Sequence, residues 1–229
     1  MSRTRLPIVL ACLWACAPAQ LRAEASLGVV SDYRYRGVSL SDGHSALQAG
    51  LVWNRDDGWY AGVFAANTRI ARADGWQLVS YLGRAWRLDS GRSWEAGVQF
   101  VAFTSHHDED YREVYLGFAS DRWSLRAYYQ PKPFGDYGPA VYAEGNASLP
   151  LGGHWLLLGH MGAGWRGGEL DAGVDRTYLD ARIGTGVGLG AFSLYLQHVW
   201  MWRRSGYLAD DLGPQAADPG WVLGVNRAW

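Results

Sequence analysis

The chain has 229 residues, of which 48% are hydrophobic and 19% are charged, and its formal net charge is −1 at pH 7. This composition excludes a disordered chain, and a net charge close to zero excludes the basic footprint of a nucleic-acid-binding protein. The length suits one ordinary domain or one large β-barrel.

The first 25 residues have the pattern of a secretory signal peptide. Two arginines precede an apolar run, 6–17, and Ala23-Glu24-Ala25 matches the small-residue rule for cleavage. We therefore predict a cleaved signal peptide at 1–25 and a mature protein at 26–229. Cleavage after Ala23 is the alternative.

Both cysteines lie in the predicted signal peptide. Cys12 and Cys16 each follow a short apolar stretch, so a lipoprotein attachment site is the competing interpretation. If the signal peptide is instead cleaved at 23 or 25, the mature chain has no cysteine, and its stability must come from packing or from closure of a sheet rather than from disulfides.

Two stretches of 20 residues, 146–165 and 183–202, contain no Asp, Glu, Lys or Arg. Their length fits a transmembrane helix, but glycine destabilises a helix interior and both stretches contain several. In the second, Gly184, Gly186 and Gly188 recur at a spacing of two, which is the strand period. Each stretch therefore predicts two strands and a turn.

The same period recurs along the whole chain, with no amphipathic helix and no domain linker. We predict an all-β protein that forms a single closed antiparallel up-and-down transmembrane β-barrel. Its twelve strands are expected at 26–38, 45–53, 59–67, 76–87, 93–103, 111–119, 123–130, 139–149, 154–166, 177–188, 191–203 and 220–229.

Apolar and polar residues alternate within these strands, so each strand has one face of each kind. The first strand is expected to place Tyr33 and Tyr35 on its apolar face and Asp32, Arg34 and Arg36 on its polar face. A water-soluble sandwich also alternates, with its aliphatic residues in the core, so alternation does not choose between the two folds.

Aromatic residues at the strand ends favour the membrane barrel, because amphipathic rings settle at the level of the lipid headgroups. One girdle is expected to contain Trp53, Trp59, Trp86, Trp94, Phe118, Trp123, Trp155, Phe192 and Trp229. The other is expected to contain Trp76, Phe103, Tyr111, Trp165, Tyr178, Trp200, Trp202 and Trp221.

The connections alternate in length, which is typical of an outer-membrane barrel with short periplasmic turns and longer outer loops. Short turns are expected at 54–58, 88–92, 120–122, 150–153 and 189–190, and longer loops at 39–44, 68–75, 104–110, 131–138, 167–176 and 204–219. Unpaired backbone groups cost several kcal/mol each in hydrocarbon, so the strands must close into a ring.

The opening of the predicted mature chain resembles the TorF-type porin family of proteobacterial outer membranes. The family pattern S-x-Y-x-x-R-G-x-S, then Q-x-G, then G-x-Y-x-G-x-W/F-x-x-N, is matched by Ser31, Tyr33, Arg36, Gly37, Ser39, Gln48, Gly50, Gly58, Tyr60, Gly62, Phe64 and Asn67. Weaker similarity continues along the chain at 111–117, 128–131, His160 with Gly162, and Tyr178 with Asp180.

The resemblance implies an outer-membrane location and a porin, but no particular solute. The family tends to have two acidic residues at spacing two in its fourth strand, where this chain has Gln77 and Val79. It also tends to end in Phe, whereas this chain ends in Trp229. The first departure puts any inherited ion preference in doubt.

The polar faces predict a charged lumen with no catalytic residues, no metal ligands and no cofactor. An open pore and a network of ion pairs that fills a narrow barrel are equally compatible with these residues. The predicted pore-lining residues are Asp32, Arg34, Arg36, Gln48, Glu95, Gln99, Glu113, Arg126, Gln130, Glu144, Asn146, Asp180, Arg182 and Gln197.

Other polar residues raise competing hypotheses. The run 106–110, His-His-Asp-Glu-Asp, is either a divalent-cation site or, more simply, a solvated loop tip. Ser105 with His106 offers the parts of a lipid-modifying enzyme, but nothing in the loop would hold the histidine rigidly. His160 is expected as a hydrogen-bonded lumen residue, and Arg84 on the apolar face as a residue that snorkels beside Trp86.

We therefore predict a porin-like channel of the bacterial outer membrane that passes small polar or ionic solutes by passive diffusion. Its expected partners are outer-membrane lipid, those solutes and the barrel-assembly machinery, which would engage the C-terminal strand ending in Trp229; no nucleic acid is expected. The alternatives are a non-conducting structural or surface-binding barrel, with the loop 204–219 as a plug or a contact for a partner, and an outer-membrane lipid-modifying enzyme.

Overall fold

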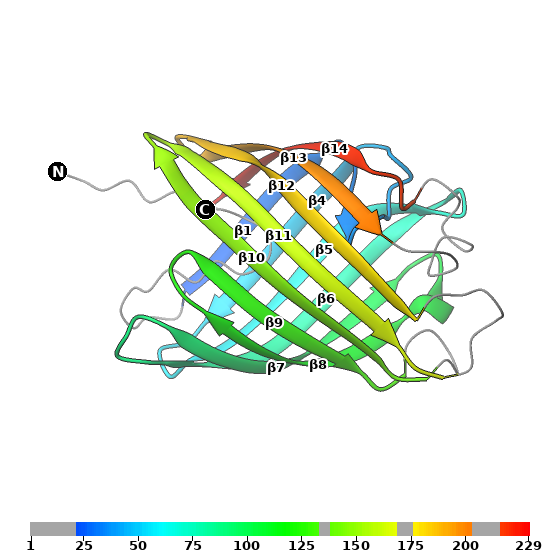
Figure 1. Ribbon diagram of the computed structural model, residues 1–229, viewed down its shortest axis with the longest axis horizontal. Helices are drawn as coiled ribbons and strands as arrows, with labels where there is room; N and C mark the ends of the chain where they lie inside the picture. Colours follow the sequence, from blue (N-terminus) through cyan, green and yellow to red (C-terminus); the bar gives the residue numbers. More distant parts are fainter. Residues whose placement is uncertain (1–21, 133–137, 169–175, 203–215) are drawn as a thin grey trace.

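The computed structural model describes residues 22–132, 138–168, 176–202 and 216–229, whose strands form a closed antiparallel barrel (Figure 1). The predicted fold class is confirmed: twelve strands of the described chain make up the barrel, each paired with its neighbours in sequence. They are β1 (Arg22–Val30), β4 (Ala46–Asn54), β5 (Trp59–Ile70), β6 (Ala73–Arg87), β7 (Ser93–Phe103), β8 (Tyr111–Ala119), β9 (Trp123–Gln130), β10 (Ala140–Gly152), β11 (Trp155–Arg166), β12 (Thr177–Leu189), β13 (Phe192–Trp202) and β14 (Gly220–Ala228).

The ring closes between its first and last strands. β1 pairs with β14 from Ser26 opposite Ala228 to Val30 opposite Gly224. The backbones of Ala25 and Trp229 add two hydrogen bonds of 3.0 Å. Because closure removes the edges of the sheet, the strands pair their backbone groups with one another, as a bilayer requires.

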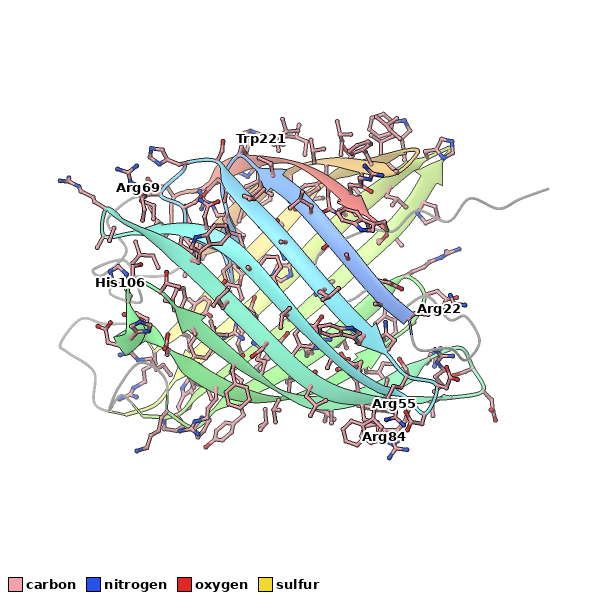
Figure 2. All side chains as sticks on the ribbon, turned by 180° about the vertical axis from the view of Figure 1, so that it is seen from behind. Arg22, Arg55, Arg69, Arg84, His106 and Trp221 are labelled. Carbon is pink, nitrogen blue, oxygen red and sulfur yellow. The ribbon has the colours of Figure 1, made fainter. Side chains whose placement is uncertain are left out.

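The two ends of the barrel differ in their connections. The short-turn end carries Arg22, Trp229 and the brief turns between β4 and β5, β6 and β7, β8 and β9, β10 and β11, and β12 and β13. The opposite, long-loop end carries the connections after β1, β7, β9, β11 and β13. In Figure 2, Arg22, Arg55 and Arg84 lie at the short-turn end, and Arg69, His106 and Trp221 lie at the long-loop end.

One expected loop is wrong. The connection predicted at 68–75 is a tight hairpin, because β5 continues to Ile70 and β6 begins at Ala73. Ala71 and Arg72 form the turn, with φ of 48° and 67°. Two central residues with positive φ match the twist of the flanking strands in a two-residue hairpin.

The outer surface of the barrel is apolar and the inner one is polar. Leu116, Leu179 and Ile183 are 50–55% exposed, whereas Glu113 and Asp180, on the inward faces of the same strands, are at most 2% exposed. Such an inverted distribution is stable only where lipid covers the outside.

Aromatic residues ring both ends of this apolar surface, with one correction. The exposed ones include Trp53, Trp59, Trp86, Trp94, Trp123, Trp155, Phe192 and Trp229 at the short-turn end and Trp76, Trp165, Trp202 and Trp221 at the long-loop end. Phe103, Tyr111 and Tyr178, expected in the outer girdle, are instead buried. Tyr111 shares its face of β8 with Glu113, so the strand period turns its ring inward.

The first strand is shorter than predicted, and this changes the interior of the barrel. β1 ends at Val30, and residues 31–44, here named the inner hairpin, contain the short paired strands β2 (Arg34–Tyr35) and β3 (Val38–Ser39). Arg36 and Gly37, with φ of 51° and 83°, form its turn. Asp32, Arg34 and Arg36 therefore belong to the hairpin rather than to a barrel strand.

The inner hairpin lies inside the barrel. Tyr33, expected to face lipid, is 5% exposed, and its hydroxyl donates a 2.5 Å hydrogen bond to Gln77 on β6. A side chain added at Gly37 would overlap Asp180 on β12, so the hairpin turn packs directly against the far wall. Tyr35 is also turned inward and accepts a hydrogen bond from Tyr111.

Tyrosine rings fill much of the remaining interior and lie across inward-facing glycines of the neighbouring strand. A Cβ atom added at the glycine would overlap the ring in each of the pairs Gly62–Tyr81, Gly83–Tyr60, Gly97–Tyr115, Gly164–Tyr178 and Gly224–Tyr195. Three further contacts place Tyr115, Tyr128, Tyr142 and Tyr178 in a row, with ring centroids 5.9–6.2 Å apart.

The helical content of the described chain is η1 (His107–Glu109), a single 3-10 turn between β7 and β8. No helix among the described residues is long and apolar enough to cross a membrane. The uncharged stretches 146–165 and 183–202 each form parts of two strands and a turn, as the glycine spacing predicted.

Candidate functional site

The candidate site is the lumen of the barrel. Of the residues predicted to line a pore, three belong to the inner hairpin and the others lie on strands with their side chains on the inward face. Buried among them, at most 8% exposed, are Asp32, Gln48, Glu95, Gln99, Glu113, Gln130 and Asp180. Arg34, Arg36, Arg126, Glu144, Asn146, Arg182 and Gln197 are partly exposed toward the interior. Whether solutes pass these side chains stays a prediction.

Arg36 ties the inner hairpin to the opposite wall. Its two terminal nitrogens each donate a 2.7 Å hydrogen bond to Glu113 on β8, and Gln99 donates another of 2.7 Å to the same carboxylate. The guanidinium also lies 4.8 Å and 4.4 Å from the ring centroids of Tyr128 and Tyr142. A bidentate, charge-assisted pair flanked by aromatic faces holds the hairpin in one position.

Asp32 organises the base of the hairpin. Its carboxylate accepts hydrogen bonds of 2.5 Å from Arg34, 2.5 Å from Ser39 and 3.1 Å from Ser41. Arg34 also donates a 2.6 Å bond to the backbone carbonyl of Asp218. The hairpin thus contacts the last residues of the loop 204–219, most of which lies outside the described residues.

A second charged cluster joins the walls nearer the short-turn end. Glu95 on β7 accepts two hydrogen bonds from Arg126 on β9 at its Oε1 atom and a 2.7 Å hydrogen bond from Tyr60 on β5 at its Oε2 atom. Tyr60 in turn lies 2.7 Å from the hydroxyl of Tyr115. The strands β5, β7 and β9, none of which pairs with another of the three, are therefore joined through the interior.

His160 lies in a third cluster and is fully engaged. Its Nε2 lies 2.8 Å from Asp180, and its Nδ1 lies 2.8 Å from Asn146. Asp180 also accepts a 2.9 Å hydrogen bond from Tyr142. The ring of His160 is thus held by an amide, a carboxylate and a phenol of neighbouring strands, as expected for a hydrogen-bonded lumen residue.

Below the hairpin lies a cavity of about 140 Å³ that reaches the turn between β8 and β9 at the short-turn end. The hairpin residues Asp32, Tyr33 and Arg34 form its roof, and residues 120–124 form its mouth. Its polar wall residues include Gln48, Asn146, Ser148, His160, Arg182, Ser193, Tyr195, Gln197 and Asn226.

The acidic loop 106–110 forms a structured turn. Asp110 accepts a 2.6 Å hydrogen bond from the backbone of Phe103 and lies 3.4 Å from His107. Within the described residues, no group of three or more His, Cys, Asp or Glu side chains is placed to hold a metal ion. Ser105 and His106 are 3.0 Å apart, but no third group orients the histidine in the described part of this loop.

Two arginines on the outer face lie among the rim aromatics at the short-turn end. Arg84 lies 5.8 Å from the ring of Trp59 and 5.7 Å from that of Trp86 (Figure 2). Arg227 is placed similarly, 5.6 Å from Phe192 and 5.5 Å from Trp229. The snorkelling position predicted for Arg84 agrees with these contacts.

The predicted first strand runs through the inner hairpin, and the predicted lumen residues do not include the buried tyrosines. The pair Arg36-Gly37 is followed by Val-Ser-Leu-Ser-Asp-Gly, a run rich in turn formers, and this signal was available to end the first strand early. The tyrosines Tyr60, Tyr115, Tyr128 and Tyr142 share strand faces with glycine or charged residues, which was the signal that they point inward.

The fold and the lumen can now be compared with known proteins. Residues 15–199 match the family model described as "Bacterial protein of unknown function (Gcw_chp)". The chain belongs to this family. No curated protein sequence matches the chain.

Solved structures share the architecture at low sequence identity. The NanC porin is 12% identical with a TM-score of 0.60, and the match covers 90% of this chain and 99% of that one. The KdgM porin in complex with disordered oligogalacturonate is 10% identical with a TM-score of 0.55, covering 91% and 99%. The COG4313 outer membrane channel from Pseudomonas putida F1 is 10% identical with a TM-score of 0.52, covering 93% and 97%. The Gcw_chp chain thus shares the closed β-barrel fold of these outer-membrane proteins.

Proposed function

We propose that this Gcw_chp protein is a porin-like channel that passes small polar or ionic solutes across the outer membrane by passive diffusion. The observation that carries the proposal is the polar, charged interior around a cavity inside a barrel with the porin fold. The resemblance of residues 31–67 to the TorF-type porins supports the same function.

The inner hairpin is the proposed constriction. Arg36 and Glu113 form their ion pair across the lumen, so a solute must pass beside this pair or displace the hairpin. A fixed cation facing fixed carboxylates imposes a transverse field that small polar solutes tolerate better than bulky or apolar ones.

The proposed orientation in the membrane is supported by the apolar outer surface of the barrel and by the unequal connections at its two ends. The short-turn end faces the periplasm, outer-membrane lipid covers the apolar band, and the barrel-assembly machinery engages the C-terminal strand that ends in Trp229. The short turns opposite longer loops support this orientation.

A non-conducting structural barrel is the second candidate. The observation in its favour is that ion pairs and tyrosine rings occupy the middle of the lumen. In this case the interior charges serve stability, and the outer loops carry whatever binding function the protein has.

Single-channel conductance in planar bilayers tests the proposal. The refolded barrel is expected to give discrete current steps, and the double variant Arg34→Ser/Arg36→Ser is expected to raise the step size at least twofold because the hairpin loses its ties to Glu113 and Asp32. The exposed-turn variant Arg92→Ser is the control and should match the wild type. Silent bilayers for both the wild type and the double variant refute the channel and favour the structural barrel.

A further inference from the structure

Asp121 and Arg122 lie exposed at the mouth of the cavity, and of the charged side chains deeper on its wall all but one are paired. Asp32 is bound to Arg34 under the hairpin, and His160 is bound to Asp180. The exception is Arg182 on the inward face of β12, which lines the cavity. Across residues 22–132, 138–168, 176–202 and 216–229, no carboxylate pairs with it and no acceptor binds it.

The charges nearest Arg182 are already engaged. It lies in register between His160 on β11 and Val199 on β13. Asp180 shares the inward face of β12 with it, but that carboxylate is bound by His160 and Tyr142. Tyr33 and Tyr195 also line the cavity, and phenols are neutral at pH 7. A guanidinium that lines a cavity needs water or an anion at its donors.

Further donors on the same wall lack acceptors. The side-chain nitrogen of Asn226 is buried and has no hydrogen-bond partner in the described chain. Gln48, 5% exposed, also lines the cavity. The wall carboxylate of Asp32 is already saturated by Arg34, Ser39 and Ser41. The cavity therefore offers donors and positive charge, which fit an acceptor-rich anion.

We propose that the cavity is a binding site for a small oxyanion, with the Arg182 guanidinium as its main contact and the amides of Asn226 and Gln48 as additional donors. A volume of about 140 Å³ corresponds to about five waters at ~30 Å³ each, so the ligand is expected to have about five or six non-hydrogen atoms. The planar guanidinium fork matches a carboxylate or a phosphate.

This inference deepens the proposed function by naming its solute class, yet it stands separately from conduction. The anion needs entry only through the mouth at 120–124, beneath the hairpin. A barrel that is silent in bilayers but binds the anion refutes the channel alone, and a conducting barrel that binds none refutes the site alone.

NMR on the full refolded barrel in detergent tests the site with three probes, using proton saturation transfer for the two organic probes and 31P line broadening for phosphate. These are sodium lactate, inorganic phosphate, and lactamide, which has nearly the size of lactate but no charge. At least one oxyanion is expected to bind the wild type, and lactamide is expected to bind at least tenfold more weakly. Preference for lactate or for phosphate identifies the class of oxyanion.

The variant Arg182→Gln is expected to weaken oxyanion binding at least tenfold, because charge-assisted hydrogen bonds are lost. The control Arg92→Gln makes the same charge change in an exposed turn and should leave binding within twofold. The lactamide comparison uses the wild type, so the test holds even if Arg182→Gln fails to fold. Failure of both oxyanions to bind, equal binding of lactamide, or unchanged binding by Arg182→Gln would overturn the inference.

Discussion

At the scale of single residues, glycine and tyrosine act as pairs inside the barrel. Tyr178 on β12 lies over Gly164 on β11, directly opposite it in the ladder. The ring occupies the volume that a side chain at 164 would need, so the two residues together fill one interior layer. The same relation at four other pairs lets large rings pack in a narrow lumen.

The variant Gly164→Ala is expected to lower the free energy of unfolding by about 1–3 kcal/mol, because its Cβ overlaps the Tyr178 ring and overpacking costs this much. Gly159→Ala on the same strand is the matched control, since its Cβ meets open space on the outer face. Urea titration in lipid vesicles, followed by tryptophan fluorescence, measures both. Equal stability of the two variants would show that the ring is free to move aside.

At the scale of elements, the inner hairpin is an insertion that the barrel itself does not require. The β1–β4 ladder already runs from Arg22 opposite Asn54 to Val30 opposite Ala46, and the hairpin begins after it. Its attachment combines apolar packing, since Val38 and Leu40 are at most 4% exposed, with polar contacts, chiefly Arg36 with Glu113 and Arg34 with the backbone of Asp218. The backbone of Leu40 also accepts a 2.7 Å hydrogen bond from Arg69 on β5. The ladder that joins β1 to β4 and the contacts of the hairpin are thus separate sets of interactions.

Replacing residues 33–42 with two glycines is therefore expected to leave a folded barrel, because β1 keeps its pairing with both β4 and β14. The shortened protein should still migrate faster on SDS gels before heating than after, and its conductance should rise severalfold over that of the full chain. An unfolded product would mean that the hairpin templates closure. A folded product with unchanged conductance would place the constriction among the Glu95 and Arg126 side chains instead.

At the scale of the whole molecule, the hydrophobic pattern is inverted relative to a soluble protein. Apolar side chains such as Leu116, Leu125 and Met161 are more than half exposed, while carboxylates and phenols fill the inside. The apolar band between the aromatic rims then defines how the barrel sits in a bilayer.

This placement predicts a depth-dependent cost for an added charge. Leu116→Arg, in the middle of β8, is expected to destabilise the barrel in lipid vesicles by about 2–4 kcal/mol, whereas Leu88→Arg, in a turn at the rim, is expected to cost only ~0–1 kcal/mol. Urea unfolding in vesicles compares the two variants. Similar costs would contradict the position of the apolar band.

The strand period was sufficient to predict the barrel because lipid enforces it. Eleven of the predicted lumen residues lie on barrel strands, among them Glu95, Glu113 and Asp180. Their inward position follows from alternation, since a slip by one residue would turn each carboxylate into hydrocarbon. The tight turn at Ala71 and Arg72 escaped because neither residue type favours positive φ.

The inner hairpin escaped for a different reason. Asp32, Arg34 and Arg36 alternate with Tyr33 and Tyr35 as a strand would, so local pattern and tertiary position disagree. The inward position of the segment depends on a long-range ion pair between Arg36 and Glu113, which are 77 positions apart in the sequence. Likewise, the hydrogen-bond donors around Arg182 come from strands that are distant in the sequence, so only the folded structure shows that they share a cavity.

The roof that the hairpin places over the cavity makes the two ends of the lumen unequal. Exchange of the cavity contents is therefore expected to be faster through the mouth at residues 120–124 than past the hairpin. A pulse of ligand would fill the cavity from the mouth before a comparable amount crosses the membrane.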